Sequence, residues 1–171
     1  ELKEAPLSEW DKDIRTRQPE AVERWRGQCD EAILLHEMLQ YFFYRQWKRL
    51  KRYANAHGVK ILGDVPIYVP VESADVWSNP DIFLLDEDYV PIEMSGCPPD
   101  VFSQEGQLWG NPIYDWKALA GNGYDWWVKR IKRNYDFYDV IRIDHFHGFC
   151  EYYSVPYGDE TAEHGSLNKG P

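Results

Sequence analysis

The stretch Val140-Ile141-Arg142-Ile143-Asp144-His145-Phe146-His147-Gly148-Phe149 contains the features that decide the fold. Its first residues are β-branched, with one arginine among them, which is typical of a buried strand. Because side chains alternate along a strand, Arg142 and Asp144 point to the same face. A guanidinium next to a carboxylate favours the ionised form of that carboxylate. Asp144 is therefore expected at the end of a strand as an ionised group, well placed to act as a nucleophile.

A structural ion pair that closes the strand is the alternative explanation of Arg142 and Asp144. A second apolar run, residues 59–69, carries Asp64 in a similar position. Pro66 cannot donate to a sheet, so the regular part of this strand should end near Asp64. Two such strands, separated by a loop and a helix, predict a parallel sheet with acids gathered at one end. A turn-forming role for Asp64 remains the other possibility.

Two helices are predicted from apolar residues that recur at three- and four-residue steps. The first covers residues 19–57, is broken near Gly27 and ends at Gly58 in the left-handed conformation. His36 lies on its apolar face and is expected to pack in the core rather than bind a ligand. The second covers residues 124–138. A helix between two parallel strands is the βαβ arrangement.

Residues 71–116 form a long stretch without convincing periodicity, apart from a small hairpin predicted near residues 82–88. A connection of this length is usually functional or disordered, and its aromatic and aliphatic residues argue against disorder. Loops held on a rigid scaffold concentrate binding residues. The turn-rich part is expected to present Phe102 and Trp109, with packing inside the loop as the alternative.

Composition narrows the classes of partner. A net charge of −10 opposes binding to nucleic acids and anionic membranes. The aromatic content of 16%, with eight Trp and twelve Tyr, exceeds what the core needs, so some rings are expected to stack on sugars. Three cysteines, Cys29, Cys97 and Cys150, indicate reduced thiols in a cytoplasmic protein. There is no run of the ~20 apolar residues that would span a bilayer, and no signal-peptide pattern.

Helix, strand, long loop, helix and strand, with acids at the strand ends, predict an α/β fold. It would be part of a (β/α)8 TIM barrel with long loops inserted after the strands. A whole barrel typically takes ~250 residues, and the chain starts at Glu1 without Met. Residues 1–171 are thus expected to be a fragment of a single catalytic domain, with 71–116 as a substrate-binding loop region. A doubly wound sheet is the alternative, but the sequence has no glycine-rich nucleotide motif.

Four motifs in order closely resemble the 4-α-glucanotransferases called amylomaltases or disproportionating enzymes (glycoside hydrolase family 77), from about Trp10 to Pro171. The motifs are Gly63–Val69, Pro98–Asp100, Gly106–Pro112 and Arg142–Phe146. The resemblance implies a retaining enzyme of the α-amylase clan that moves α-1,4-glucan segments between malto-oligosaccharides by double displacement. No cofactor and no resident metal are expected.

The resemblance also implies roles for individual residues. Asp144 would be the nucleophile and Arg142 its support. The expected substrate-binding residues are Asp64, Asp100, Phe102, Gln107, Trp109, Asn111 and His145. A glutamate that acts as general acid and base, and a further aspartate, should lie beyond Pro171, so the fragment alone is expected to be inactive. His147 departs from the family, whose members commonly carry Arg there, and this changes the charge near the nucleophile.

Three other functions are compatible with parts of the pattern. His145-x-His147 after a strand could begin a metal site, as in barrel hydrolases. A non-catalytic glucan-binding module would explain the aromatic residues. An α-amylase-type hydrolase is the nearest enzymatic alternative. It is distinguished from a transferase by its products, since it would release new reducing ends instead of transferring glucan.

Overall fold

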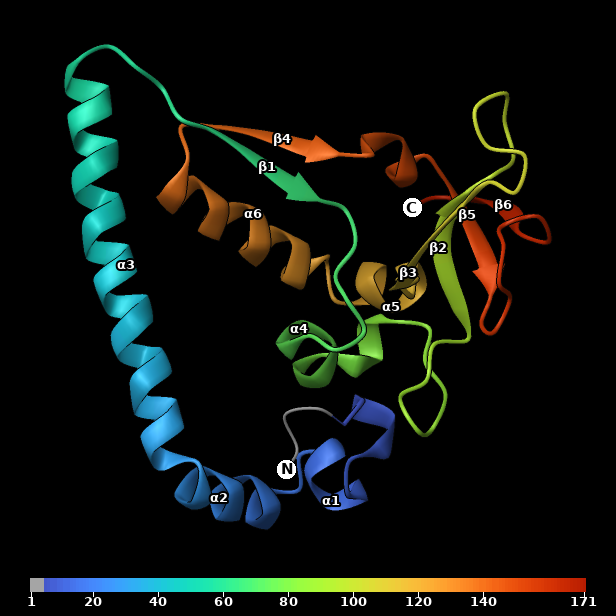
Figure 1. Ribbon diagram of the computed structural model, residues 1–171, viewed down its shortest axis with the longest axis horizontal. Helices are drawn as coiled ribbons and strands as arrows, with labels where there is room; N and C mark the ends of the chain where they lie inside the picture. Colours follow the sequence, from blue (N-terminus) through green and yellow to red (C-terminus); the bar gives the residue numbers. More distant parts are fainter. Residues whose placement is uncertain (1–4) are drawn as a thin grey trace. The chain divides into compact units, whose positions relative to one another are not determined.

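The structure is a computed structural model that describes residues 5–171; the first four residues of the expected fragment lie outside this range. The chain divides into two compact units. The helical unit comprises residues 11–65 and 127–142, and the sheet unit comprises residues 5–10, 66–126 and 143–171. Both are mixtures of helix and strand elements, which agrees with the predicted α/β class at that level (Figure 1).

The helical unit is built largely from the two predicted helices and the two predicted strands. Its elements are α1 (Lys12–Arg15), α2 (Pro19–Gln28), α3 (Asp30–Ala56), β1 (Leu62–Pro66), α6 (Asp125–Phe137) and β4 (Val140–Asp144), the ends of the last three crossing into the sheet unit. The break in the first helix falls at Cys29, two residues after the predicted Gly27. Gly58 has a φ of 76°, which confirms the left-handed stop.

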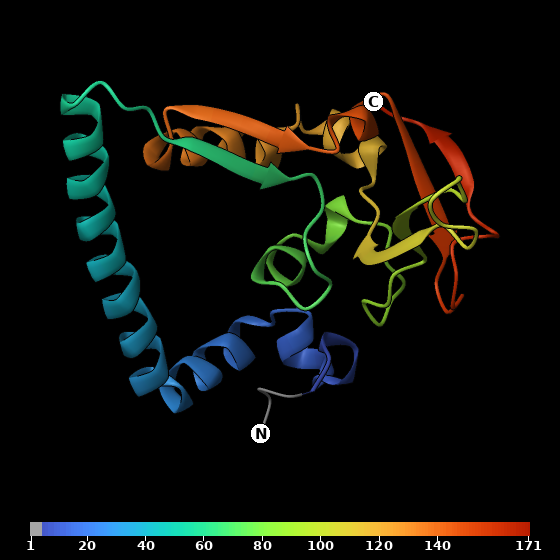
Figure 2. The ribbon, with the colours of Figure 1, turned by 45° about the horizontal axis from the view of Figure 1, so that its top comes forward.

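Strands β1 and β4 pair as a two-stranded sheet, and their arrows run in the same direction in Figures 1 and 2. Asp139, just before β4, fixes the start of β1. Its carboxylate accepts hydrogen bonds from the Ile61 amide at 2.9 Å and from Asn55 at 2.8 Å, and lies 3.6 Å from the Lys51 ammonium. The expected burial of β4 was wrong for the described residues, since Val140 is 43% exposed.

Helix α3 packs against α6 through a few aromatic contacts. The Trp47 indole donates to the Phe137 carbonyl at 2.8 Å, and the Tyr44 ring meets the Phe137 ring edge to face. Within residues 5–171, however, no residue of α3 is fully buried, and His36 is exposed. The expectation that His36 packs in the core was therefore wrong. Periodicity specifies which face of a helix is apolar, but it does not specify what covers that face.

The sheet unit contains a four-stranded antiparallel sheet with the order β3-β2-β5-β6. The strands are β2 (Glu93–Cys97), β3 (Gln107–Pro112), β5 (Glu151–Pro156) and β6 (Ser166–Lys169). Tyr153, Val155 and Ala162 form its small core, with Leu108 packed against them. The sequence analysis did not predict this sheet. Its shortest strand, Ser-Leu-Asn-Lys, is mostly polar and gains its structure from pairing with β5.

The long stretch 71–116 is ordered through short elements. They are α4 (Ala74–Ser78), η3 (Pro80–Ile82), β2, β3 and the first residue of α5 (Trp116–Gly121), while η2 (Leu7–Glu9) and η4 (Phe146–Phe149) lie outside it. The small hairpin is confirmed by a bridge between Leu85 and Pro91 and by the bond from the Asp86 amide to the Val90 carbonyl at 2.9 Å. Around Tyr114 and Val76, this stretch also supplies much of the buried core of the unit.

Within residues 5–171, no helix combines the length and the apolar character that crossing a membrane requires.

Candidate functional site

A pocket of about 260 Å³ lies in the sheet unit at the end of β4. Three chain segments meet there: the residues just after β1, the middle of β3, and the turn after β4. It is lined by Pro66, Ile67, Tyr68, Trp109, Asn111, Asp144 and His145. The structure therefore brings together four of the residues predicted from the sequence: Trp109, Asn111, Asp144 and His145.

Asp144 is the last residue of β4 and is exposed to solvent. The chain then turns sharply, because His145 adopts the left-handed conformation with φ 52° and ψ 42°. A non-glycine residue in this region is uncommon and costs conformational energy, and such residues cluster at functional sites. The turn leads into η4, so that the carboxylate at the strand end stands beside the imidazole that follows it.

Gly148, in η4, is what allows this turn to pack tightly. A Cβ at this position would lie 2.8 Å from the Ile67 Cδ1 atom and 3.1 Å from the His145 Cδ2 atom. Both of these side chains line the pocket. A residue with a Cβ would therefore require these two pocket-lining side chains to shift.

The His145 imidazole contacts the Trp109 indole edge to face, with ring centroids 4.8 Å apart and an interplanar angle of 84°. Burial lowers the pKa of His145, the nearby His147 lowers it further, and the Asp144 carboxylate acts in the opposite direction. The net result is a pKa below the ordinary 6.5, so the ring is mostly neutral at pH 7.

Trp109 is held from two further sides. Its indole N–H donates to the Gln107 side-chain oxygen at 3.0 Å, along the same strand. Its ring also lies 6.3 Å from the Tyr68 ring at an angle of 50°. Gln107, predicted to bind substrate, is not among the pocket-lining residues and instead orients the indole.

Tyr68 is a pocket residue that the sequence analysis missed. It is 5% exposed, and burial is the main cause that raises its pKa above the ordinary 10.0, so it remains protonated. Its ring stacks on Tyr114, whose hydroxyl donates to the Ile67 carbonyl at 2.8 Å. The signal was present, because Tyr68 belongs to the same quoted motif as Asp64 and follows the end of β1 by two residues.

The predicted residues Asp100 and Phe102 lie outside the pocket lining. The Asp100 carboxylate accepts hydrogen bonds from the Phe102 and Ser103 amides, both at 2.8 Å, and thus closes a tight loop. Ser103 donates its hydroxyl proton to the Gly106 carbonyl at 2.6 Å. The Phe102 side chain stands on this loop and is 94% exposed.

Asp64 and Arg142 form an ion pair within the helical unit, between β1 and β4. The side chains are each 57% exposed, so the pair is well solvated and contributes little to stability. Arg142, which was expected to support Asp144, thus forms an ion pair with Asp64, and Asp64 lies in the middle of β1 and not at its end. Gly63 of β1 allows the Tyr138 ring to lie close to the strand, because a Cβ at this position would meet that ring.

In the described part of the chain, no three His, Cys, Asp or Glu side chains gather in a way that would hold a metal ion. The thiols of Cys29, Cys97 and Cys150 are free.

A strand-end carboxylate in a pocket walled by aromatic rings is a site of the kind that carbohydrate-active proteins use. The comparisons with known proteins define the family. A family model described as 4-alpha-glucanotransferase matches residues 1–171, the whole chain. The chain therefore belongs to the 4-alpha-glucanotransferase family.

Individual relatives agree with this assignment. The 4-alpha-glucanotransferase of Clostridium butyricum is 53% identical over 163 residues, which are 95% of this chain and 34% of the relative. The one of Synechocystis is 49% identical over 95% of this chain and 32% of its own length. A solved amylomaltase from Streptococcus agalactiae in complex with acarbose has a TM-score of 0.94 at 46% identity, covering 98% of this chain and 34% of that one. The chain thus spans about a third of these relatives.

Proposed function

We propose that this chain forms part of a 4-α-glucanotransferase, in which Asp144 is the nucleophile that carries an α-1,4-glucan segment from one malto-oligosaccharide to another. The observation that carries the proposal is the pocket in which Asp144 stands with Trp109 and His145. Membership of the family and the likeness to an amylomaltase solved with acarbose support it.

The reaction would be a double displacement with retained configuration. An Asp144 oxygen attacks the anomeric carbon, the bond to the glycosidic oxygen breaks, and a general acid gives a proton to the departing glucan. The 4-hydroxyl of a second glucan then attacks the same carbon and loses its proton to that group, now a base. The bond between this carbon and the Asp144 oxygen breaks in the same step, which restores the Asp144 carboxylate, so the number of glycosidic bonds stays constant.

The general acid in this scheme is a glutamate outside residues 1–171. Retaining chemistry requires it at ~5–5.5 Å from the nucleophile, and Glu151 is too close in sequence to Asp144 for this role. The expected consequence is that the 171-residue chain alone leaves maltotriose unchanged. Formation of longer dextrins by this chain would refute the assignment of the acid.

Transfer rather than hydrolysis requires that water be kept from the glycosyl-enzyme intermediate. Trp109, oriented by Gln107 and His145, supplies one apolar wall for this purpose. Asn111 and His145 are polar side chains of the pocket and are assigned to sugar hydroxyls. Asp100 shapes the loop that carries Phe102, which would lie over bound sugar as an exposed apolar tip.

The remaining parts of the proposal concern the surroundings of the site. Arg142 and Asp64 would form a charged pair that supports the nucleophile and contacts substrate. The chain would be one part of a (β/α)8 catalytic domain with residues 71–116 as a substrate-binding loop region, acting in the cytoplasm on malto-oligosaccharides and α-1,4-glucans. The match over 98% of the chain to an amylomaltase supports the barrel, and the free thiols are compatible with a reducing compartment.

The test uses the intact protein and maltotriose. Glucose and longer dextrins should appear while the total of reducing ends stays constant. Asp144→Asn should lower kcat by roughly a thousandfold or more, as removal of a covalent nucleophile does, and should retain glucan binding. A steady rise in reducing ends would instead identify a hydrolase. Unchanged turnover in Asp144→Asn would remove this residue from the mechanism.

A further inference from the structure

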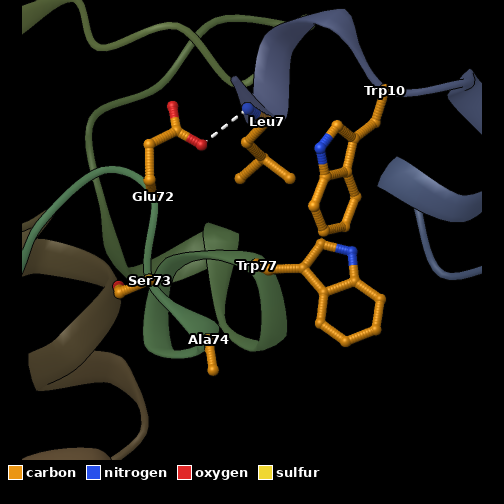
Figure 3. A pocket seen from close by; sticks show the side chains of 6 residues that line it. All are labelled: Leu7, Trp10, Glu72, Ser73, Ala74 and Trp77. Atoms are coloured by element: carbon orange, nitrogen blue, oxygen red, sulfur yellow. Dashed lines mark hydrogen bonds between the residues drawn. The ribbon is translucent and has the colours of Figure 1, made fainter. Parts of the chain in front are cut away.

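A second pocket, of about 200 Å³, lies elsewhere in the sheet unit (Figure 3). It is lined by Leu7, Trp10, Glu72, Ser73, Ala74 and Trp77, none of which lines the Asp144 pocket. Its two walls are η2 with the residue that follows it, and the first residues of α4 with the turn before them. They come from parts of the chain about 65 residues apart.

These walls are fixed to each other before any ligand arrives. The Glu72 carboxylate accepts a hydrogen bond from the Leu7 amide at 2.7 Å, the bond drawn in Figure 3. Leu7 is 2% exposed and Val76 of α4 is 0% exposed, so both walls are anchored in the core of the unit. A pocket whose shape is set in advance loses less entropy on binding than one that must be assembled.

The two tryptophans give the pocket its chemical character. The Trp10 and Trp77 rings lie 6.0 Å apart at 60° to each other, and both side chains are half-buried. The Trp10 indole N–H donates to the Ala5 carbonyl at 3.0 Å, so this ring offers a ligand its apolar face. The C–H face of a glucose ring is apolar and flat, and it matches such a surface.

The polar groups at the other side of the pocket suit sugar hydroxyls. The Glu72 carboxylate uses one oxygen for Leu7, and a carboxylate has about four acceptor sites in total. The Ser73 hydroxyl accepts from the Val76 amide at 3.2 Å, which leaves its own O–H as a donor. The volume is below the roughly 300–1,000 Å³ of pockets that enclose a whole ligand. It fits one ring of a longer chain.

We propose that the pocket between Trp10 and Trp77 is an accessory binding site for one glucosyl unit of a long α-glucan. This inference rests on the proposed glucan substrate and adds a second point of contact to it. Two linked contacts raise the effective concentration of the chain at the Asp144 pocket. The gain applies to glucans long enough to reach both pockets and is absent for short ones.

Kinetics of the intact protein test the accessory site. Trp77→Ala should raise the KM for amylose several-fold and leave the KM for maltotriose and both kcat values unchanged. Trp77→Phe keeps an aromatic face and should restore most of the lost affinity. Trp25→Ala, at a half-buried tryptophan of α2 in the other unit, is the matched control and should leave the ratio of the two KM values unchanged.

Equal effects of Trp77→Ala on amylose and maltotriose, or no effect on either, would overturn the accessory site, even if the variant is less stable. If the unaltered protein turns over neither substrate, the proposed transfer reaction fails, and titration calorimetry with maltoheptaose still decides the binding question. Weaker binding by Trp77→Ala than by Trp77→Phe would support the site in that case. Equal heats for the two variants would reject it.

Discussion

The imidazole of His145, just after β4, meets the indole of Trp109, in the middle of β3, edge to face with ring centroids 4.8 Å apart. The contact joins the residue that follows Asp144 to the aromatic wall of the same pocket. An edge-to-face aromatic pair contributes about 0.5–1.5 kcal/mol beyond the burial of its area. This pair therefore helps to hold the aromatic wall of the pocket in place.

Replacement of Trp109 should change the partition between transfer and hydrolysis. Trp109→Leu removes the indole, its bond to Gln107 and its contact with His145. An aromatic contact contributes about 0.5–1.5 kcal/mol. If the barrier to attack by water falls by this amount, the share of the glycosyl-enzyme intermediate that water captures should rise roughly two- to tenfold. The ratio of new reducing ends to transferred glucan from maltotriose measures this share.

Trp109→Phe keeps an aromatic wall and is the control; it should lie between the native protein and Trp109→Leu. A Leu variant with the native ratio would show that this side chain does not protect the intermediate.

The pKa of His145 should be measurably below its ordinary 6.5 in an NMR titration of the imidazole protons. Because burial is the main cause and His147 the second, His147→Ala should raise the pKa of His145 by a part of the shift. The unfolded chain then binds the proton more readily than the folded chain, so this residue lowers stability as the pH falls through 6.5 toward the folded pKa. A pKa at or above 6.5 would contradict the burial of the ring.

Gly148→Ala should destabilise the fold by about 1–3 kcal/mol, the usual cost of overpacking. The added methyl group would meet Ile67 and His145, both of which line the pocket. Urea unfolding measures the loss. Gly121→Ala is the matched control, since a Cβ there meets no atom within 4 Å, and it should be neutral or slightly stabilising. Equal stability of the two variants would mean that the turn after Asp144 is looser than its contacts indicate.

Asp139→Ala should loosen the start of β1, because the Ile61 amide and Asn55 lose their acceptor. Asp139→Asn keeps an oxygen for these bonds and should be milder. The bond from Ile61 is the main cause that lowers the pKa of Asp139 below 3.8. The stabilisation is thus complete above pH 3.8 and is lost as the pH falls through the lowered pKa.

The difference in unfolding midpoint between native protein and Asp139→Asn should therefore shrink on acidification below pH 3.8. A difference that stays constant at low pH would show that the ionised carboxylate is not the stabilising form.

Local signals in the sequence predicted the elements of the helical unit well. The periodicity of α3 and α6, the left-handed Gly58 and the β-branched run of β4 all act over a few residues. The burial of α3 was not predictable in the same way, because the exposure of Leu34 or Phe43 depends on what lies opposite them. The antiparallel sheet was missed for a related reason, since β6 pairs with β5 through backbone groups that leave no mark in a polar tetrapeptide.

The residues of the candidate site could likewise be predicted where a local motif contains them, but their contacts in the folded chain could not. Asp144, His145, Trp109 and Asn111 were predicted from motifs and meet in one pocket. The motifs did not reveal that Gln107 accepts a hydrogen bond from Trp109, or that Asp100 closes its own loop. Both hydrogen bonds depend on the conformation of the folded backbone. Their substrate-binding roles, like those of Asp64 and Phe102, stay predictions.

The strand order of the antiparallel sheet fixes where β3, which carries Trp109, lies relative to β5. Trp109 sits on β3, and Asp144 is tied through the short η4 turn to β5, with β2 between the two strands. Neighbouring strands lie ~4.8 Å apart, so β3 lies ~10 Å from β5. The loop at residues 98–106 joins β2 to β3, so a change in its length would leave unchanged the spacing between the strand that carries Trp109 and the strand that follows the Asp144 turn.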